Sequence, residues 1–332
     1  MGRRVLLGRA LMSVPGHAYN RLAMSMKKMA PGTMGGQSRV ANLPGPTASV
    51  RVSAPPAPEP LTCPTFLGRT QTTMGFGGPF LLPDQSEIIQ WNDSVVRRYA
   101  YPVNGSPEIE SFSPSGSTSG MALTPDSALW RVNSTGDIIR RNGYTSAASD
   151  TTIDTLAESR AQLVYSSHDG NLYAVTFVAS STINIYRITL GGTVTLMQAT
   201  GITVGTTAGS QAVTPIAVAA GSSVWFTNPT VVGYSITGFN LWRYDIDADT
   251  FASVGTPTPT DGAMAVDHQG YAIYSGSNDP TMLYRINEDE ESEYLDCPEL
   301  YAPGGESGLQ GGNTIPGDPS VAVMSHYYEY TG

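Results

Sequence analysis

A strand–hairpin–strand unit recurs six times between residues 80 and 332, and this repeat limits the possible folds more than any other feature. Each copy has a run of small apolar residues, a polar turn, and a second run with aromatic or branched side chains. The copies are FLLPDQSEIIQWN (80–92), MALTPDSALWRVN (121–133), LVYSSHDGNLYAVT (163–176), IAVAAGSSVWFTN (216–228), MAVDHQGYAIYSG (264–276) and VAVMSHYYEYTG (321–332). Alternation on both sides of each turn indicates half-buried strands. The predicted turns centre on Asp84, Asp126, Asp169, Gly221, Gln269 and His326.

A third strand follows five of the six hairpins, and each of these strands carries an arginine at the same place. The strands read VVRRY (95–99), DIIRRN (137–142), IYRIT (185–189), LWRYD (241–245) and LYRIN (283–287). Their arginines, at intervals of 42 to 56 residues, are Arg98, Arg140, Arg187, Arg243 and Arg285. Because apolar residues alternate with them, we expect the guanidiniums to pair with carboxylates of neighbouring repeats and to serve structure rather than ligand binding.

Four short strands per unit and a period of about 40–55 residues are typical of β-propellers. Residues 61–332 resemble a six-bladed β-propeller of the kelch or NHL type. LWRYDIDADTF (241–251) is similar to the aromatic-Asp-x-x-x-x-Thr turn between the outer strands of such blades. The Trp-Asp dipeptide of WD40 repeats is absent, as is the glycine pair that ends the inner strands of kelch repeats. The resemblance implies an all-β, six-bladed propeller.

The last repeat stops at Gly332 without outer strands, which would leave an open sheet edge. We expect residues 61–76 (LTCPTFLGRTQTTMGF) to join this blade and close the ring. Cys63 and Cys297 would then lie near the closure, either as a disulfide or as two separate thiols.

Charge divides the chain into a basic N-terminal segment and an acidic remainder. Residues 1–58 hold eight basic side chains and no acidic one, whereas the remainder has ten basic and 28 acidic residues. The two net charges are therefore +8 and −18, which together give the −10 of the whole chain. We expect a basic arm over residues 1–60 and a propeller over residues 61–332. The basic residues of the arm are Arg3, Arg4, Arg9, Arg21, Lys27, Lys28, Arg39 and Arg51.

The arm has one predicted helix and an extended remainder. Tyr19–Ala30 has Leu and Met at helical spacing, Asn20 as an N-cap and two lysines near its end, which predicts a short helix. Residues 41–60 are rich in Pro and Ala and should be extended. Three interpretations stay open: an arm anchored on the acidic surface of a neighbouring subunit, a solvated tail, or a mitochondrial transit peptide with residues 1–30 cleaved.

Few patterns point to catalysis or to a cofactor. Gly-x-Ser-x-Gly, Walker A, GxGxxG and HExxH motifs are absent, and we predict no cofactor. His168, His268 and His326 all fall on first hairpins of their repeats, where a propeller would let them converge. They are either a metal site or ordinary turn residues.

Two acidic clusters have a structural and a binding interpretation. Asp245, Asp247 and Asp249 alternate as in calcium loops, but Thr250 stands where the EF-hand needs glycine, which favours a solvated hairpin. The run Glu288–Glu293 is either a solvated loop or a surface that accepts a basic arm. The charge of −18 argues against nucleic-acid binding by the propeller. No run of 18 apolar residues occurs, so we expect no membrane-spanning helix.

These observations predict a non-enzymatic structural or attachment protein of a large assembly. The low charge, the richness in Ser, Thr and Gly and the scarcity of Lys resemble, by composition alone, proteins of phage or virus particles. That resemblance implies a virion location, in a tail or capsid, with a neighbouring acidic subunit and a host-surface glycan as partners. The alternative is an enzyme or a carbohydrate-binding propeller with its site at the mouth of the channel, targeted to an organelle if the arm is a transit peptide.

Overall fold

The computed structural model describes residues 4–10, 80–82, 86–91, 95–100, 108–179, 181–204, 206–207, 211–212, 217–232, 235–254, 259–266, 271–276, 282–287, 292–296, 307–315 and 318–328. The chain divides into two units, one of Met1–Met12 with Pro60–Gly332 and one of Ser13–Glu59, and all described residues belong to the first. These residues form strands and turns without a helix, which confirms the predicted all-β class. No helix capable of crossing a membrane occurs in the described ranges.

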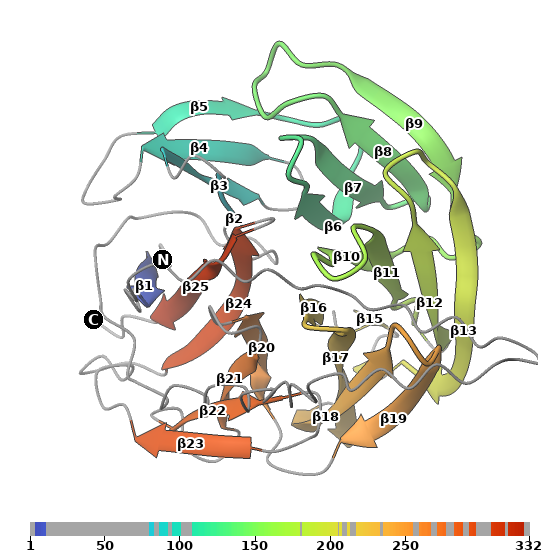
Figure 1. Ribbon diagram of the computed structural model, residues 1–332, viewed down its shortest axis with the longest axis vertical. Coiled ribbons are helices and arrows are strands. Elements are labelled where there is room, and N and C mark those ends of the chain that lie inside the picture. Colours follow the sequence, from blue (N-terminus) through green and yellow to red (C-terminus); the bar gives the residue numbers. More distant parts are fainter. Residues whose placement is uncertain are drawn as a thin grey trace, which may run out of the picture. The chain divides into compact units, whose positions relative to one another are not determined.

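Five antiparallel sheets of four strands follow one another along the chain (Figure 1). The first has β2 (Phe80–Leu81), β3 (Glu87–Trp91), β4 (Val96–Ala100) and β5 (Glu108–Phe112). The second has β6 (Thr118–Leu123), β7 (Leu129–Asn133), β8 (Asp137–Arg141) and β9 (Asp150–Thr155). The third has β10 (Ala161–Tyr165), β11 (Leu172–Thr176), β12 (Thr182–Ile188) and β13 (Val194–Thr203). The fourth has β16 (Ala217–Ala220), β17 (Ser223–Val232), β18 (Ser235–Asp245) and β19 (Thr250–Val254). The fifth has β20 (Pro259–Val266), β21 (Ala272–Gly276), β22 (Met282–Ile286) and β23 (Ser292–Asp296), and the small hairpin of β14 (Thr206–Thr207) and β15 (Gln211–Ala212) precedes the fourth sheet.

Neighbouring sheets meet through their first strands, which lie at the centre, while the fourth strands lie at the rim (Figure 1). β6 contacts β10, β10 contacts β16, and β16 contacts β20. Burial follows the same order: every residue of β7 and β11 is buried, whereas β9 and β13 are largely exposed. The arrangement is a β-propeller with one blade per sheet.

The hydrophobic core is divided among the interfaces between blades, because each interior strand is covered on both faces. The interface of the first and second blades includes Ile89, Trp91, Met121 and Leu123. That of the second and third includes Trp130, Val132, Leu163 and Ala174, and that of the third and fourth includes Tyr173, Val175, Phe226 and Tyr244. That of the fourth and fifth includes Trp225, Leu241, Met264 and Tyr274.

The last repeat departs from the prediction. β24 (Ser307–Ile315) contacts the first strands β20 and β2, and β25 (Asp318–Tyr328) pairs with β24. The outer partner of β25 is β1 (Arg4–Ala10), which gives a three-stranded sheet in the order β1-β25-β24. The predicted blade count was therefore wrong, since the described residues form five four-stranded blades where six were expected. His326 lies within the continuous strand β25 and not on a hairpin.

One predicted strand is formed by other residues than expected, and several other predictions concern residues outside the described ranges. The strand that joins β25 is Arg4–Ala10, whereas residues 61–76, which we expected there, lie outside the described residues. The helix predicted over Tyr19–Ala30 also lies outside them, as do Cys63 and Cys297. Of the basic arm residues, Arg4 and Arg9 belong to β1, and the other six lie outside. Docking of the arm on an acidic neighbour stays a prediction.

Candidate functional site

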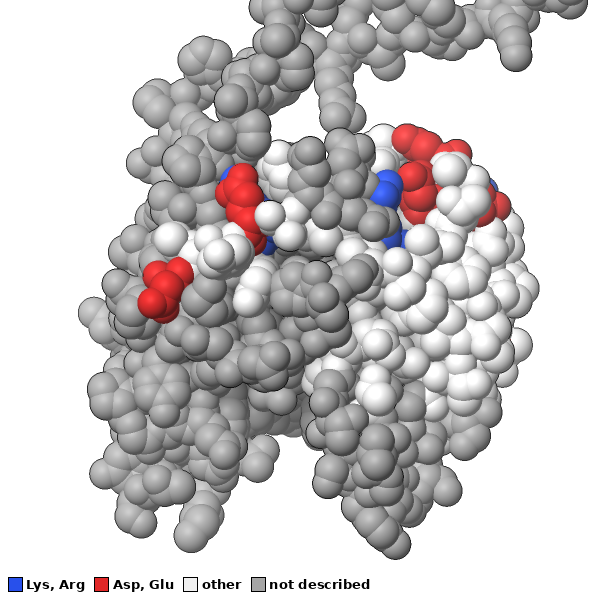
Figure 2. All heavy atoms as spheres, turned by 90° about the horizontal axis from the view of Figure 1, so that it is seen from below, with Lys and Arg blue, Asp and Glu red and all other residues white. Residues whose placement is uncertain are grey.

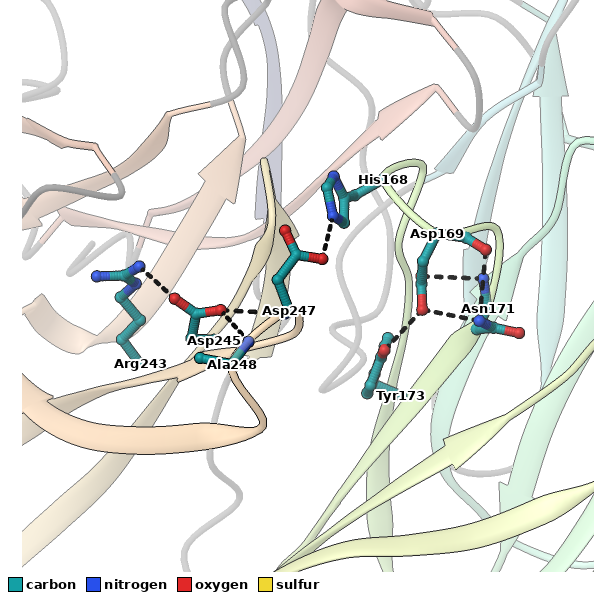
Figure 3. A network of polar contacts seen from close by, with 8 residues as sticks. All are labelled: His168, Asp169, Asn171, Tyr173, Arg243, Asp245, Asp247 and Ala248. Atoms are coloured by element: carbon teal, nitrogen blue, oxygen red, sulfur yellow. Dashed lines mark hydrogen bonds and ion pairs between the residues drawn. The ribbon is translucent and has the colours of Figure 1, made fainter. Parts of the chain in front are cut away.

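Two hairpins from neighbouring blades meet on one face of the propeller. In a meander, the turn from first to second strand and the turn from third to fourth strand open on the same side, which we call the hairpin face. His168 lies on the β10–β11 turn of the third blade, and Asp247 lies on the β18–β19 turn of the fourth. Figure 3 shows the two side chains pointing toward each other, with Nε2 of His168 2.9 Å from Oδ1 of Asp247. This contact joins residues 79 positions apart in the sequence.

A tyrosine–carboxylate pair, Tyr173 and Asp169, lies next to His168 in the sequence. Asp169 accepts hydrogen bonds from the hydroxyl of Tyr173 at 2.7 Å and from Nδ2 of Asn171 at 2.7 Å (Figure 3). Burial raises the pKa of Asp169, but these hydrogen bonds outweigh burial and hold that pKa below its ordinary value. Burial, the hydrogen bond and the nearby carboxylate raise the pKa of Tyr173 well above its ordinary value. The pair therefore stays a carboxylate acceptor and a phenol donor at neutral pH.

A second such pair belongs to the fourth blade. Tyr244 donates to Oδ1 of Asp249 at 2.9 Å, and Nε2 of Gln198, from the third blade, donates to the same oxygen at 3.0 Å. Burial, followed by the contact with Asp249, raises the pKa of Tyr244. Asp249 has a φ of 52°, which is costly for a residue with a Cβ. The rings of Tyr173 and Tyr244 lie 5.9 Å apart, so the two pairs form one junction between blades.

The three alternating aspartates do not form a calcium site. Asp245 accepts from the backbone amides of Asp247 and Ala248 at 3.0 and 2.9 Å and from Arg243 at 3.1 Å (Figure 3). Asp247 and Asp249 point to His168 and Tyr244 instead. No group of three or more metal-ligating side chains occurs among the described residues. The carboxylates thus form hydrogen bonds within the hairpin and to the neighbouring third blade, and the prediction of simple solvation was incomplete.

The repeat arginines bind carboxylates within their own blade, which corrects the expectation of pairs between repeats. Arg98 contacts Glu87 at 2.7 Å and Glu110 at 2.5 Å. Arg140 pairs with Asp126, Arg243 with Asp245 and Arg285 with Glu293, at 2.8, 3.1 and 2.7 Å. Four of the five therefore serve structure, as predicted. Arg187 differs, because no ion pair joins it to any carboxylate in the described part of the chain.

Convergence of the other two predicted histidines with His168 stays a prediction. His268 lies outside the described residues, and His326 belongs to β25 in the three-stranded sheet. From the acidic run, Glu293 is described, and it holds Arg285. On the face seen in Figure 2, the described acidic side chains lie in separate groups, with basic side chains beside some of them.

Sequence reasoning missed both tyrosines of the junction. Tyr173 and Tyr244 stand in strands whose pattern already explained them as core residues, and both are fully buried. A usable signal was present: each tyrosine has an aspartate four or five positions away, across a turn.

Comparison with known proteins adds information on fold alone. No family model matches the chain, and no curated protein sequence matches it. Similar solved structures include an inactive variant of virginiamycin B lyase from Staphylococcus aureus, with 13% identity, 76% of this chain and 80% of that chain covered, and a TM-score of 0.46. A TolB-like protein from Agrobacterium tumefaciens has 13% identity, coverage of 78% and 92%, and a TM-score of 0.47. A luciferin-regenerating enzyme has 10% identity, coverage of 77% and 91%, and a TM-score of 0.48.

The prediction of a non-enzymatic protein is contradicted. Proteins of similar architecture include named enzymes, such as the lyase and the luciferin-regenerating enzyme, so a propeller fold gives no reason to exclude catalysis. At these low sequence identities, neither the activity nor the substrate of a similar protein can be assigned to this chain. None of these similar structures supports the predicted virion role.

Proposed function

We propose that the protein is an enzyme that uses His168 as a general base on the hairpin face. The supporting observation is the 2.9 Å contact between His168 and Asp247 across two blades. An ionised carboxylate only accepts hydrogen bonds, so Nε2 of a neutral His168 carries the proton and Nδ1 keeps its lone pair. In the described part of the chain no residue hydrogen-bonds to Nδ1. Asp247 thus fixes the tautomer that a general base requires.

The reaction that suits this pair is hydrolysis of an ester or lactone. Nδ1 of His168 takes a proton from water while the water oxygen bonds to the carbonyl carbon. The carbon–oxygen bond to the leaving group then breaks, and the imidazolium returns its proton to the leaving oxygen. Asp247 stabilises the imidazolium through the contact already present. The histidine side chain is 21% exposed and Asp247 is 70% exposed, so water and a small substrate reach the pair.

Hydrolysis of p-nitrophenyl acetate and of dihydrocoumarin tests the proposal. We expect His168→Asn to lower kcat/KM by about 10²–10⁴-fold, and Asp247→Asn to lower it less. Ser167→Ala, a change at the exposed neighbour of His168, is the matched control and should leave the rate unchanged. Full activity of His168→Asn, or a wild-type protein inert toward both probes, would contradict the proposal.

A further inference from the structure

Arg187 is the exception among five arginines that occupy equivalent positions. It stands in β12 opposite Tyr173 of β11, as Arg140 stands in β8 opposite Trp130 of β7. Nε is buried without a partner in both arginines, but Arg140 binds Asp126 through Nη2, whereas Arg187 has no hydrogen bond or ion pair in the described residues. A buried guanidinium N–H that has no hydrogen-bond partner destabilises the folded protein, so such a group calls for an explanation.

Arg187 lies beside the junction of the two tyrosine–aspartate pairs, because it stands in β12 directly opposite Tyr173 of β11. Its positive charge acts on both phenols, and by itself it lowers the pKa values of Tyr173 and Tyr244, which burial raises. Tyr173 in turn binds Asp169, the residue that follows His168 in the sequence. The free cation and the proposed general base are therefore linked through Tyr173 and Asp169.

The two carboxylates of the junction, Asp169 and Asp249, are bound by other donors. Asp169 accepts from Asn171 and Tyr173, and Asp249 accepts from Tyr244 and Gln198. Neither forms an ion pair with Arg187, although each binds a phenol on which Arg187 acts. The junction thus holds a guanidinium whose geometry suits an anion with two oxygens and to which no carboxylate of the described residues is bound.

We propose that Arg187 recognises an oxyanion, a carboxylate or phosphate group, on the substrate of the site. This inference rests on the proposed function, since it places the bound group beside His168. The anion serves as the charged partner that Glu87, Asp126, Asp245 and Glu293 provide for the other four arginines. Arg187 is then a specificity residue, and His168 acts on the uncharged part of the same molecule.

Isothermal titration calorimetry with D-glucuronate, inorganic phosphate and D-glucose tests this inference on the full chain. We expect wild-type protein to bind at least one of the two anions more tightly than D-glucose, with affinity that falls as salt is added. Arg187→Gln should weaken anion binding at least tenfold. Arg140→Gln, the same change at the equivalent position of the second blade, should not. Tighter binding of D-glucuronate identifies a carboxylate, and tighter binding of phosphate identifies a phosphate group.

Two further measurements separate the possible failures. His168→Asn should bind the anions as the wild type does, so loss of ester hydrolysis with retained anion binding supports both proposals. Retained hydrolysis in His168→Asn together with lost anion binding in Arg187→Gln would overturn the general base and keep the anion site. Equal anion affinity of wild-type and Arg187→Gln proteins, or no anion binding by the wild type, would overturn the anion site. Thermal unfolding checks the fold: Arg187→Gln should keep the wild-type midpoint, whereas Arg98→Gln, which loses two carboxylate contacts, should lower it.

Discussion

Asp150 holds two buried guanidiniums at once. Its two oxygens lie 2.8 Å from Nη2 of Arg131 and 2.7 Å from Nη1 of Arg141. Arg131 is 2% exposed, and Arg141 stacks on Phe112 at 4.4 Å from the ring centre. Burial raises the pKa of Asp150, but the hydrogen bonds from Arg141 and Arg131 outweigh burial, so that its pKa lies below the ordinary value. Folding therefore favours the ionised form of this carboxylate.

Stability should depend on pH through Asp150. A lowered folded-state pKa gives stabilisation that is fully present above the unfolded value of about 3.9 and is lost as pH falls through the folded value. Asp150→Asn should lower the free energy of unfolding by about 3–5 kcal/mol at pH 7, because two buried arginines lose their charged partner. The deficit should shrink as the pH falls below about 3.9. Urea unfolding at a series of pH values measures this.

The exposed Asp154 of the same strand supplies the control. Its side chain accepts a hydrogen bond from the neighbouring amide of Thr155 and has no arginine partner among the described residues. Asp154→Asn should change stability by less than about 0.5 kcal/mol at any of these pH values. A deficit for Asp150→Asn that is equally small, or that does not vary with pH, would argue against the buried-pair account.

At this scale the sequence predicts residue types better than partners. His168, Asp247 and the five arginines were all singled out from the sequence. The pairing of His168 with Asp247 was not predicted, because the relative placement of two blades decides which turns face each other. The arginines are equivalent in sequence, but their carboxylates come from a first hairpin, a second strand, a third strand or an outer strand. Arg187 therefore could not be distinguished before the structure was known.

At the scale of the strand, two backbones meet closely where β6 passes β10. A Cβ added to Gly120 would lie 2.2 Å from the carbonyl oxygen of Ala161 and 2.8 Å from the Cα of Gln162. The hydroxyl of Ser119 bridges the same two strands, with its oxygen 3.3 Å from the amide nitrogen of Ala161. Glycine is required at position 120 because the neighbouring atoms are backbone and cannot move aside.

Gly120→Ala should therefore destabilise the protein. We expect a loss of about 1–3 kcal/mol, in the range for inserted atoms that force backbone shifts. Gly191→Ala is the matched control, because its added Cβ would meet only Oγ1 of Thr189, at 3.8 Å. Differential scanning calorimetry of the two variants measures the effect. A melting temperature for Gly120→Ala as high as that for Gly191→Ala would contradict the close approach.

Strands were predicted well where turn chemistry was unambiguous. All five arginine-bearing third strands are confirmed, as are the turns at Asp126, Asp169 and Gly221. The last repeat failed because Ser325 and His326 are weak turn residues, whereas Pro316-Gly317 just before the repeat is a strong turn signal. β24 ends at Ile315 and β25 begins at Asp318, on either side of that dipeptide.

At the scale of the whole ring, closure depends on a strand from the start of the sequence. The seven residues of β1 pair in register with β25, from Arg4 opposite Tyr328 to Ala10 opposite Ala322. Composition placed these residues in a basic arm, since charge and proline content cannot show that a short apolar stretch will add to a distant sheet. The propeller architecture itself was predictable, because it follows from a repeat that local alternation reveals.

Deletion of residues 1–12 should loosen this sheet before the others. β25 would keep its pairing with β24 but lose β1, its outer neighbour, and would become an open edge of the sheet. We expect amides of β25 to lose at least about tenfold in hydrogen-exchange protection, or about 1.4 kcal/mol. Amides of β7 and β11, enclosed between blades, should keep theirs. Unchanged protection of β25 after the deletion would contradict closure by β1.

Pairing of β1 with β25 also has a consequence in time. β1 leaves the ribosome about 300 residues before β25, which at about 5–20 residues per second is an interval of roughly 15–60 s. The blades between them are synthesised in order, and each can pack on the one before while β1 still lacks its partner. β1, the first of the described strands to be synthesised, is thus among the last to pair with its partner. Until β25 is made, the nascent chain must keep β1 from pairing with the edge strand of another blade.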